Sequence, residues 1–276
     1  MNARYIAVGL LRRLMPPWVL FLHLKLTGRH NTSESAPSLA IQSYIDTLEK
    51  HGESLSGRHV LELGSGRFAR GAIQLIAHGA KCVTLVDPFA LHICDPAHEQ
   101  LLRQDCDSQN LDWDHIRDRI EVVRYELSEL VPSHVAPIDL IISHSVLEHV
   151  VSPKDVFVKI AELLRPGGTT LHFIDLRDHN FAFRHPFEML KYSDFIWTNF
   201  LNLRGGFHVN RFRLPHYLSA IEKTGLGDVD FEITDSDLEQ LCEVYDQLAP
   251  NFKSIDQQTL AALKVSLFAR KLDATN

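Results

Sequence analysis

The sequence is poor in the residue types that mark several classes of protein. Its 276 residues include only four cysteines (Cys82, Cys94, Cys106 and Cys242), and none of them forms a CxxC pair. This number and spacing predict neither a disulfide framework nor a zinc ribbon, and they suit a reducing compartment. Basic residues are outnumbered 28 to 35, which gives a formal net charge of −7. Because phosphate binding needs a basic surface, we expect a protein that binds no nucleic acid. The cysteine usage leads us to expect a cytoplasmic location.

The sequence also lacks a hydrophobic run long enough to cross a bilayer. The most apolar stretch, residues 5–26, is interrupted by two arginines and two prolines, and each half is too short to span a membrane. We expect two short helices that pack on the rest of the molecule, with contact to a membrane surface or to a partner chain, such as a second copy in a homodimer, as the alternative. A polar linker, residues 31–38, follows. Residues 1–38 are thus predicted to form an N-terminal helical arm.

Short apolar segments alternate with helical patterns in the main domain, residues 39–276. Segments of this kind are typical of buried parallel strands, and five of them come first: His59–Leu63, Cys82–Val86, Ile120–Val123, Ile138–Ile142 and Thr170–Ile174. Apolar periodicity and helix-end signals predict helices at residues 39–50, 68–78, 97–103 and 153–164. This alternation predicts a Rossmann-like, doubly wound α/β sheet with helices on both faces. We expect four further elements: a helix at 215–224, a strand at 228–233, a helical insert at 237–248 and a final strand at 264–270.

Residues 176–213 differ in composition from the rest of the domain. They hold seven of the 15 phenylalanines, together with one tyrosine and one tryptophan. We interpret this segment as an aromatic-rich lid inserted after the fifth strand. The alternative is that its rings fill a second small core.

The first strand runs into a glycine turn, Val60-Leu61-Glu62-Leu63-Gly64-Ser65-Gly66. Glycines allow a tight turn and a close approach of the backbone to a ligand, and the helix that follows offers free amide donors. The turn also satisfies the dinucleotide pattern GxGxxA, with Asp87 about 20 residues further on, so an NAD(P)-dependent oxidoreductase is an alternative. Glu62 argues for a different ligand, because a carboxylate there suits an amino group and repels phosphates. Moreover, no tyrosine is followed four residues later by lysine, the proton-transfer pair of short-chain dehydrogenases.

Four motifs follow one another along residues 58–175. They are the glycine turn, Val86-Asp87, the segment DLIISHSVLEHV at 139–150, and Leu164-Arg165-Pro166-Gly167-Gly168. As a set they closely resemble the successive motifs of class I S-adenosylmethionine-dependent methyltransferases. The resemblance implies a seven-stranded, mostly parallel sheet whose last strand is antiparallel, with S-adenosyl-L-methionine as the cofactor.

The resemblance also implies roles for individual residues. By position, the family would place Glu62, Gly64, Ser65 and Gly66 around the methionine part of the donor, Asp87 on the ribose hydroxyls, Glu126 at the adenine amino group, and Ser143 and His144 along the methyl-donor pocket. One departure is Phe68, which stands where the family often has a third glycine. A non-catalytic binding or scaffold protein on the same fold therefore remains a further alternative.

The acceptor must lie beyond the carboxyl ends of the strands, near the donor. A hydroxyl acceptor requires a base, for which histidine is suited, and the candidates are His179, His144 and His149, of which His179 has the best position. Arg177, Arg184 and Arg204 could hold an anionic acceptor. We expect no metal: Asp175, Asp178 and Asn180 supply part of an oxygen-ligand set, but strand four ends in Ser-His-Ser.

A looser likeness concerns the arm, the Asp-Leu-Arg-Asp-His exit of the fifth strand and the end of the last strand. These features resemble bacterial methyltransferases that modify glycans or other secondary metabolites. The likeness implies a small-molecule or glycan acceptor that is methylated at oxygen.

Overall fold

The computed structural model describes residues 2–16, 19, 38–131, 135, 137–179, 185–202 and 208–273. Apart from Val19, the second apolar run of the predicted arm lies outside these residues, as does the linker up to residue 37. Within the described ranges, no helix is long and apolar enough to cross a membrane.

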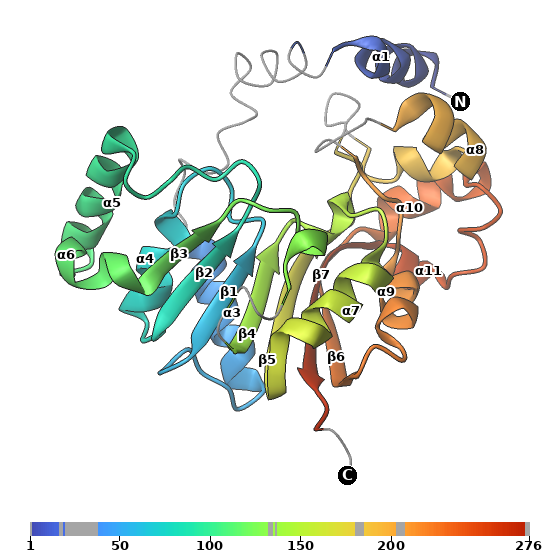
Figure 1. Cartoon of the computed structure of the whole chain (residues 1–276). Coiled ribbons are helices and arrows are strands. Elements are labelled where there is room, and N and C mark those ends of the chain that lie inside the picture. The colour runs from blue at the N-terminus through green and yellow to red at the C-terminus, as the bar shows by residue number, and fades with distance from the viewer. Residues whose placement is uncertain are drawn as a thin grey trace.

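A single sheet of seven strands forms the centre of the molecule (Figure 1). The strands are β1 (His59–Leu63), β2 (Cys82–Val86), β3 (Ile120–Val123), β4 (Ile138–His144), β5 (Leu164–Asp175), β6 (Leu226–Ser236) and β7 (Ala262–Lys271). Their order is β3-β2-β1-β4-β5-β7-β6, and β7 runs antiparallel to both of its neighbours while the other pairs are parallel. The predicted Rossmann-like sheet with an antiparallel last strand is confirmed, and the first three strands have the predicted bounds.

Helices cover both faces of the sheet because successive strand residues point to opposite faces. The helices are α3 (Ser38–Lys50), α4 (Arg70–Ala77), α5 (Pro96–Ser108), α6 (Trp113–Ile116), α7 (Pro153–Leu163) and α9 (Leu214–Ile221). Val60 of β1 packs in one core with α3, α4 and α5, whereas its neighbour Leu61 packs in another with α7 and α9. The carboxyl ends of β1, β2, β4 and β5 therefore meet at one edge, between the two helical layers (Figure 1).

The Arg-Pro-Gly-Gly segment has a different role from the predicted helix stop. Helix α7 ends at Leu163, and β5 starts at once with Leu164, which pairs with Ile138. The next pair joins Leu140 to Thr169, so the four residues between form a bulge in β5, and Gly167 adopts a φ of +69° there. A proline cannot donate to the ladder and a glycine accepts this φ, which explains why the segment suits a bulge.

A third core joins the N-terminal helix to the aromatic insert and the segment between β6 and β7. Helix α1 (Ala3–Leu14) supplies Tyr5, which stacks on Tyr192 with ring centroids 5.3 Å apart. Arg13 donates to the carbonyls of Thr198 and Asn202 (3.0 and 2.6 Å). Helices α8 (Asp194–Ile196), α10 (Leu238–Val244) and α11 (Gln257–Leu260) lie on the same side of the molecule (Figure 1). The described part of the arm thus packs on the insert.

The aromatic side chains of the insert divide between this core and the surface. Phe187, Tyr192 and Trp197 are buried, while Phe195 and Phe200 are exposed. Rings of the insert therefore contribute to this shared core, as the alternative expected, and two others face the solvent.

Candidate active site

The glycine turn after β1 depends on two residues with left-handed backbone. Gly64 has a φ of +66° and Gly66 a φ of +76°. Residues other than glycine adopt this backbone region only at a cost in free energy. The amide of Gly64 donates to the Val86 carbonyl at 2.9 Å. A Cβ atom at position 64 would lie 2.4 Å from Cγ2 of Val146, so the turn passes directly under the exit of β4.

Asp87, at the end of β2, ties this turn to the neighbouring strand. Its carboxylate accepts from the Gly66 amide (2.9 Å) and from the Phe89 amide (2.7 Å). The side chain predicted to meet the ribose hydroxyls therefore faces the glycine turn and helps to shape it.

Glu62 lies beside Asp87, and one oxygen of its carboxyl group has no partner among the described residues. Its Oε2 atom is buried and has no hydrogen-bond partner among the described residues, and the same is true of Oγ of Ser65. Gly71 of α4 gives the carboxylate room, because a Cβ atom there would lie 2.9 Å from Oε2. Burial, and then the charge of Asp87, raise the pKa of Glu62 to about 7. An orphaned buried carboxyl group is costly, and an ammonium group would satisfy it.

Two other predicted donor-site residues lie differently from expectation. Strand β3 ends at Val123, and Glu126 is exposed and caps the short turn Leu127–Glu129. The Ser143 side chain is buried within the sheet, its Oγ 2.7 Å from Nδ1 of His172, so only its backbone can line the donor pocket. Strand alternation explains this correction, because His144 occupies the opposite face.

Phe68 does not fill the glycine turn. Its ring packs edge-on against His98 of α5, with centroids 5.6 Å apart. Nε2 of the same histidine accepts from the Ala69 amide at 3.0 Å, directly before α4 begins. The bulky residue at the position of the family's third glycine thus belongs to the contact between α4 and α5.

A cavity of about 430 Å³ opens at the carboxyl ends of β4 and β5. It is lined by side chains from five elements and their exits: Ser43, His144, Ser145, Phe173, Ile174, Asp175, Arg177, Thr234, Asp235, Lys264 and Val265. Its wall carries cations and carboxylates together, and Arg177 pairs with Asp175 at 2.6 Å. Arg184 and Arg204, the other two arginines considered for an anionic acceptor, lie outside the described residues.

His144 is the one predicted catalytic histidine that lines this cavity. Its ring lies near Phe173 and Tyr44, with centroids 5.6 and 6.5 Å away. Burial, and then the charge of Lys264, lower the pKa of His144. The imidazole is therefore neutral at neutral pH and able to accept a proton.

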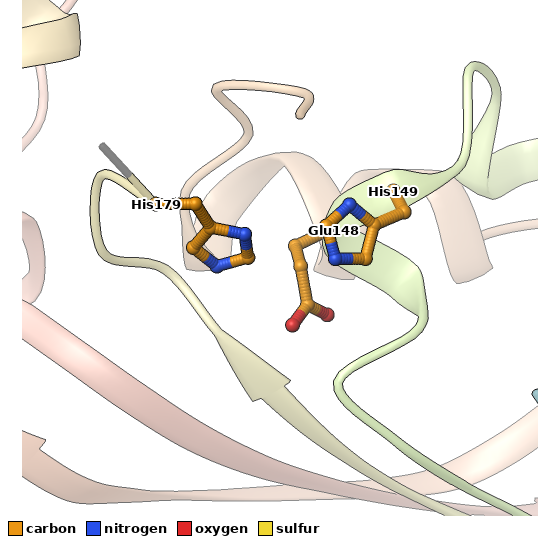
Figure 2. Close-up of side chains that lie close together, drawn as sticks. All are labelled: Glu148, His149 and His179. Carbon is orange, nitrogen blue, oxygen red and sulfur yellow. The ribbon is translucent and has the colours of Figure 1, made fainter. Parts of the chain in front are cut away.

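His149 and His179 lie together, with ring centroids 5.0 Å apart. Burial, and then His149, lower the pKa of His179 to about 4. Glu148 completes the group (Figure 2). Glu148 was not among the residues expected at the site, although it directly precedes His149 on the turn that follows β4.

Comparison with known proteins shows the family of the chain. A family described as a methyltransferase domain matches residues 37–230. The chain belongs to this family. It uses S-adenosyl-L-methionine as its methyl donor, and the match decides between that donor and a dinucleotide. None of the curated proteins compared matches the sequence.

Solved structures of other proteins are similar to this chain in fold. A putative O-methyltransferase from Nostoc punctiforme is 11% identical, with a TM-score of 0.52 over 96% of this chain and 67% of that one. An S-adenosylmethionine-dependent methyltransferase from Mesorhizobium loti is 16% identical, with a TM-score of 0.48 over 82% and 96% of the two chains. A Haemonchus contortus phosphoethanolamine N-methyltransferase, solved with S-adenosylhomocysteine, is 18% identical, with a TM-score of 0.48 over 84% and 53%. At these identities the likeness concerns the fold alone.

Proposed function

We propose that this methyltransferase modifies a hydroxyl group of a small polar acceptor, of small-metabolite or sugar type, bound in the cavity at the ends of β4 and β5. The observation that carries the proposal is the cavity wall, where His144 lies among positively charged hydrogen-bond donors and negatively charged acceptors. Hydroxyl groups both donate and accept hydrogen bonds, so a polyhydroxylated compound can use both kinds of partner.

The donor site is assigned to the glycine turn. S-adenosylmethionine supplies a methyl carbon activated by a sulfonium. Glu62 would pair with its ammonium group, and Asp87 would meet the ribose hydroxyls. The left-handed backbone at Gly64 and Gly66 forms the turn beside them.

His144 would then act as the general base. As the bond between acceptor oxygen and methyl carbon forms and the carbon–sulfur bond breaks, the hydroxyl proton passes to the neutral imidazole. Holding acceptor and donor in line contributes the rest of the rate enhancement.

The test is methyl transfer from labelled S-adenosylmethionine to a metabolite extract and to a panel of sugars and hydroxylated metabolites. We expect labelled products that survive mild acid and carry an O-methyl group in their fragment spectra. Products labelled only at nitrogen or sulfur would overturn the assignment of oxygen, and labelled protein or nucleic acid alone would overturn the assignment of a small acceptor.

A further inference from the structure

A second group of chemically active side chains lies next to the cavity, and the proposed transfer step does not use it. Glu148 and His149 come from the turn η4 (Leu147–His149) after β4, and His179 comes from the loop after β5. One ligand atom from each lies within 4.8 Å of the other two. Figure 2 shows the two imidazole rings on either side of the Glu148 side chain.

Glu148 is enclosed by protein without being satisfied by it. The residue is 1% exposed, and neither carboxylate oxygen has a partner at normal hydrogen-bond geometry within the described ranges. Nearby amides and the Ser145 hydroxyl lower its pKa in part, but burial outweighs them and raises the pKa to about 8. A buried carboxyl group in this state requires a cation or a proton.

His149 is already oriented as a ligand. Its Nδ1 lies 2.6 Å from the His208 carbonyl, which can only accept, so Nδ1 carries the hydrogen. The lone pair of Nε2 is then available. Metal-bound histidines usually have this arrangement, in which a carbonyl fixes the tautomer and the ring orientation.

Both loops that carry these residues are held in place. The Asn210 side chain donates to the carbonyl of Leu147 in the turn (2.7 Å) and to that of Val150 directly after it (3.0 Å), and the Asn210 backbone amide donates to the Glu148 carbonyl (2.7 Å). On the other loop, Asp178 accepts from the Tyr5 hydroxyl at 2.6 Å, directly before His179. Side chains on fixed segments lose little conformational entropy when a metal ion binds to them.

We propose that Glu148, His149 and His179 bind a divalent first-row transition-metal ion through one carboxylate oxygen and two imidazole nitrogens. Two histidines and one carboxylate hold zinc or iron in other proteins, and they leave coordination positions for water or a substrate oxygen. Magnesium and calcium take oxygen ligands and are poorer occupants. This set differs from the Asp175, Asp178 and Asn180 group from which the sequence predicted no metal. The proposal goes beyond methyl transfer, and neither depends on the other.

The experiment uses the full chain, stripped with EDTA and titrated with ZnCl₂ and MnCl₂ by calorimetry. We expect one ion per chain by elemental analysis, with a Kd below about 1 μM for at least one of the two ions. The thermal midpoint should rise by about 5 °C at a hundredfold excess over Kd. If the stripped protein binds neither ion, the proposal is wrong.

Variants separate a metal site from surface binding and from loss of folding. Glu148→Gln keeps the shape and removes the carboxylate that would bind the ion, so metal affinity should fall by about 100-fold or more. The metal-free variant should melt no lower than the wild type, because glutamine is neutral like the protonated acid that it replaces. His179→Ala should lose the ion as well. His115→Ala changes an exposed imidazole and should bind the metal normally.

Two outcomes of this series overturn the metal site. One is Glu148→Gln binding metal as tightly as the wild type, and the other is His115→Ala losing the ion. S-adenosylhomocysteine binding is measured on every variant and reports on the donor site alone. A protein that binds this ligand but no metal therefore rejects the metal site and leaves the methyltransferase assignment intact.

Discussion

The pH dependence of S-adenosylhomocysteine binding tests the donor site most sharply, because the Glu62 carboxyl group titrates near neutrality. Burial, and then the charge of Asp87, raise the pKa of Glu62 from 4.5 to about 7. The other titratable group that faces it is the Tyr44 hydroxyl, whose pKa burial raises well above its ordinary value, so it stays protonated. In the ligand-free protein Glu62 is therefore mostly protonated below pH 7, and it must release that proton to pair with an ammonium group.

The size of the effect follows from linkage. If the ligand lowers the pKa of Glu62 to about 4.5 or less, the association constant should rise about 30-fold between pH 5.5 and 8, with nearly all of the rise below pH 7.5. The same shift acts on stability. A raised folded-state pKa contributes stability that is complete below pH 4.5 and is lost as the pH rises through 7, by roughly 3 kcal/mol for this shift.

Calorimetry at four pH values, in two buffers of different ionisation enthalpy, measures both the affinity and the protons released. Glu62→Gln should give weaker binding that is nearly independent of pH, and it should remove the stability loss between pH 4.5 and 7. Glu49→Gln, a change on the exposed face of α3, should follow the wild type. A wild-type affinity that is constant within about threefold over this range, or an equal rise in Glu62→Gln, would refute the role of Glu62.

Three further predictions concern the turn, the base and the arm. Gly57→Ala places a side chain at positive φ with nothing within 4 Å, and it should lose about 1–2 kcal/mol of folding free energy. Gly64→Ala adds to this strain a Cβ atom 2.4 Å from Val146, so it should lose more and, unlike Gly57→Ala, weaken S-adenosylhomocysteine binding more than about tenfold in calorimetry. His144→Phe should lower kcat by about 10²- to 10⁴-fold with an unchanged donor Kd, and a change confined to KM would contradict a general base. Tyr5→Phe removes the hydrogen bond to Asp178 and should lower the free energy of unfolding in urea by about 1.5–3 kcal/mol; an unchanged transition would mean that the arm does not hold that loop.

The sheet was predictable because its strands are short, fully buried and bounded by turns. The glycine turn, with Glu62 before it and Asp87 after the next strand, was predictable for the same reason: local sequence dictates where a parallel strand ends. The bulge in β5 was missed because Arg165-Pro166-Gly167-Gly168 has the composition of a helix stop, and only pairing with β4 shows that the chain is already in a strand.

The other misses depend on contacts between distant segments. Nothing local to Ser143 shows that its hydroxyl meets His172 on the adjacent strand. Glu148, His149 and His179 lie together on two loops that distant residues hold. Asn210 hydrogen-bonds the turn after β4, and the Tyr5 hydroxyl hydrogen-bonds Asp178 on the other loop. Such contacts are set by tertiary packing, which residue spacing does not encode.

The two orphaned carboxyl groups suggest why this edge of the sheet is built as it is. Among the described residues, Glu62 and Glu148 are the only acidic side chains with buried oxygens that lack a hydrogen-bond partner. Each such group costs about 1–3 kcal/mol, so neither helps the empty fold. Glu62 lies near the carboxyl end of β1 and Glu148 on the turn after β4, the edge at which ligands bind in open α/β sheets. An ammonium group at Glu62 and a metal ion at Glu148 would each offset this cost only when bound. The buried carboxyl groups without partners therefore lie where we expect the ligands to bind.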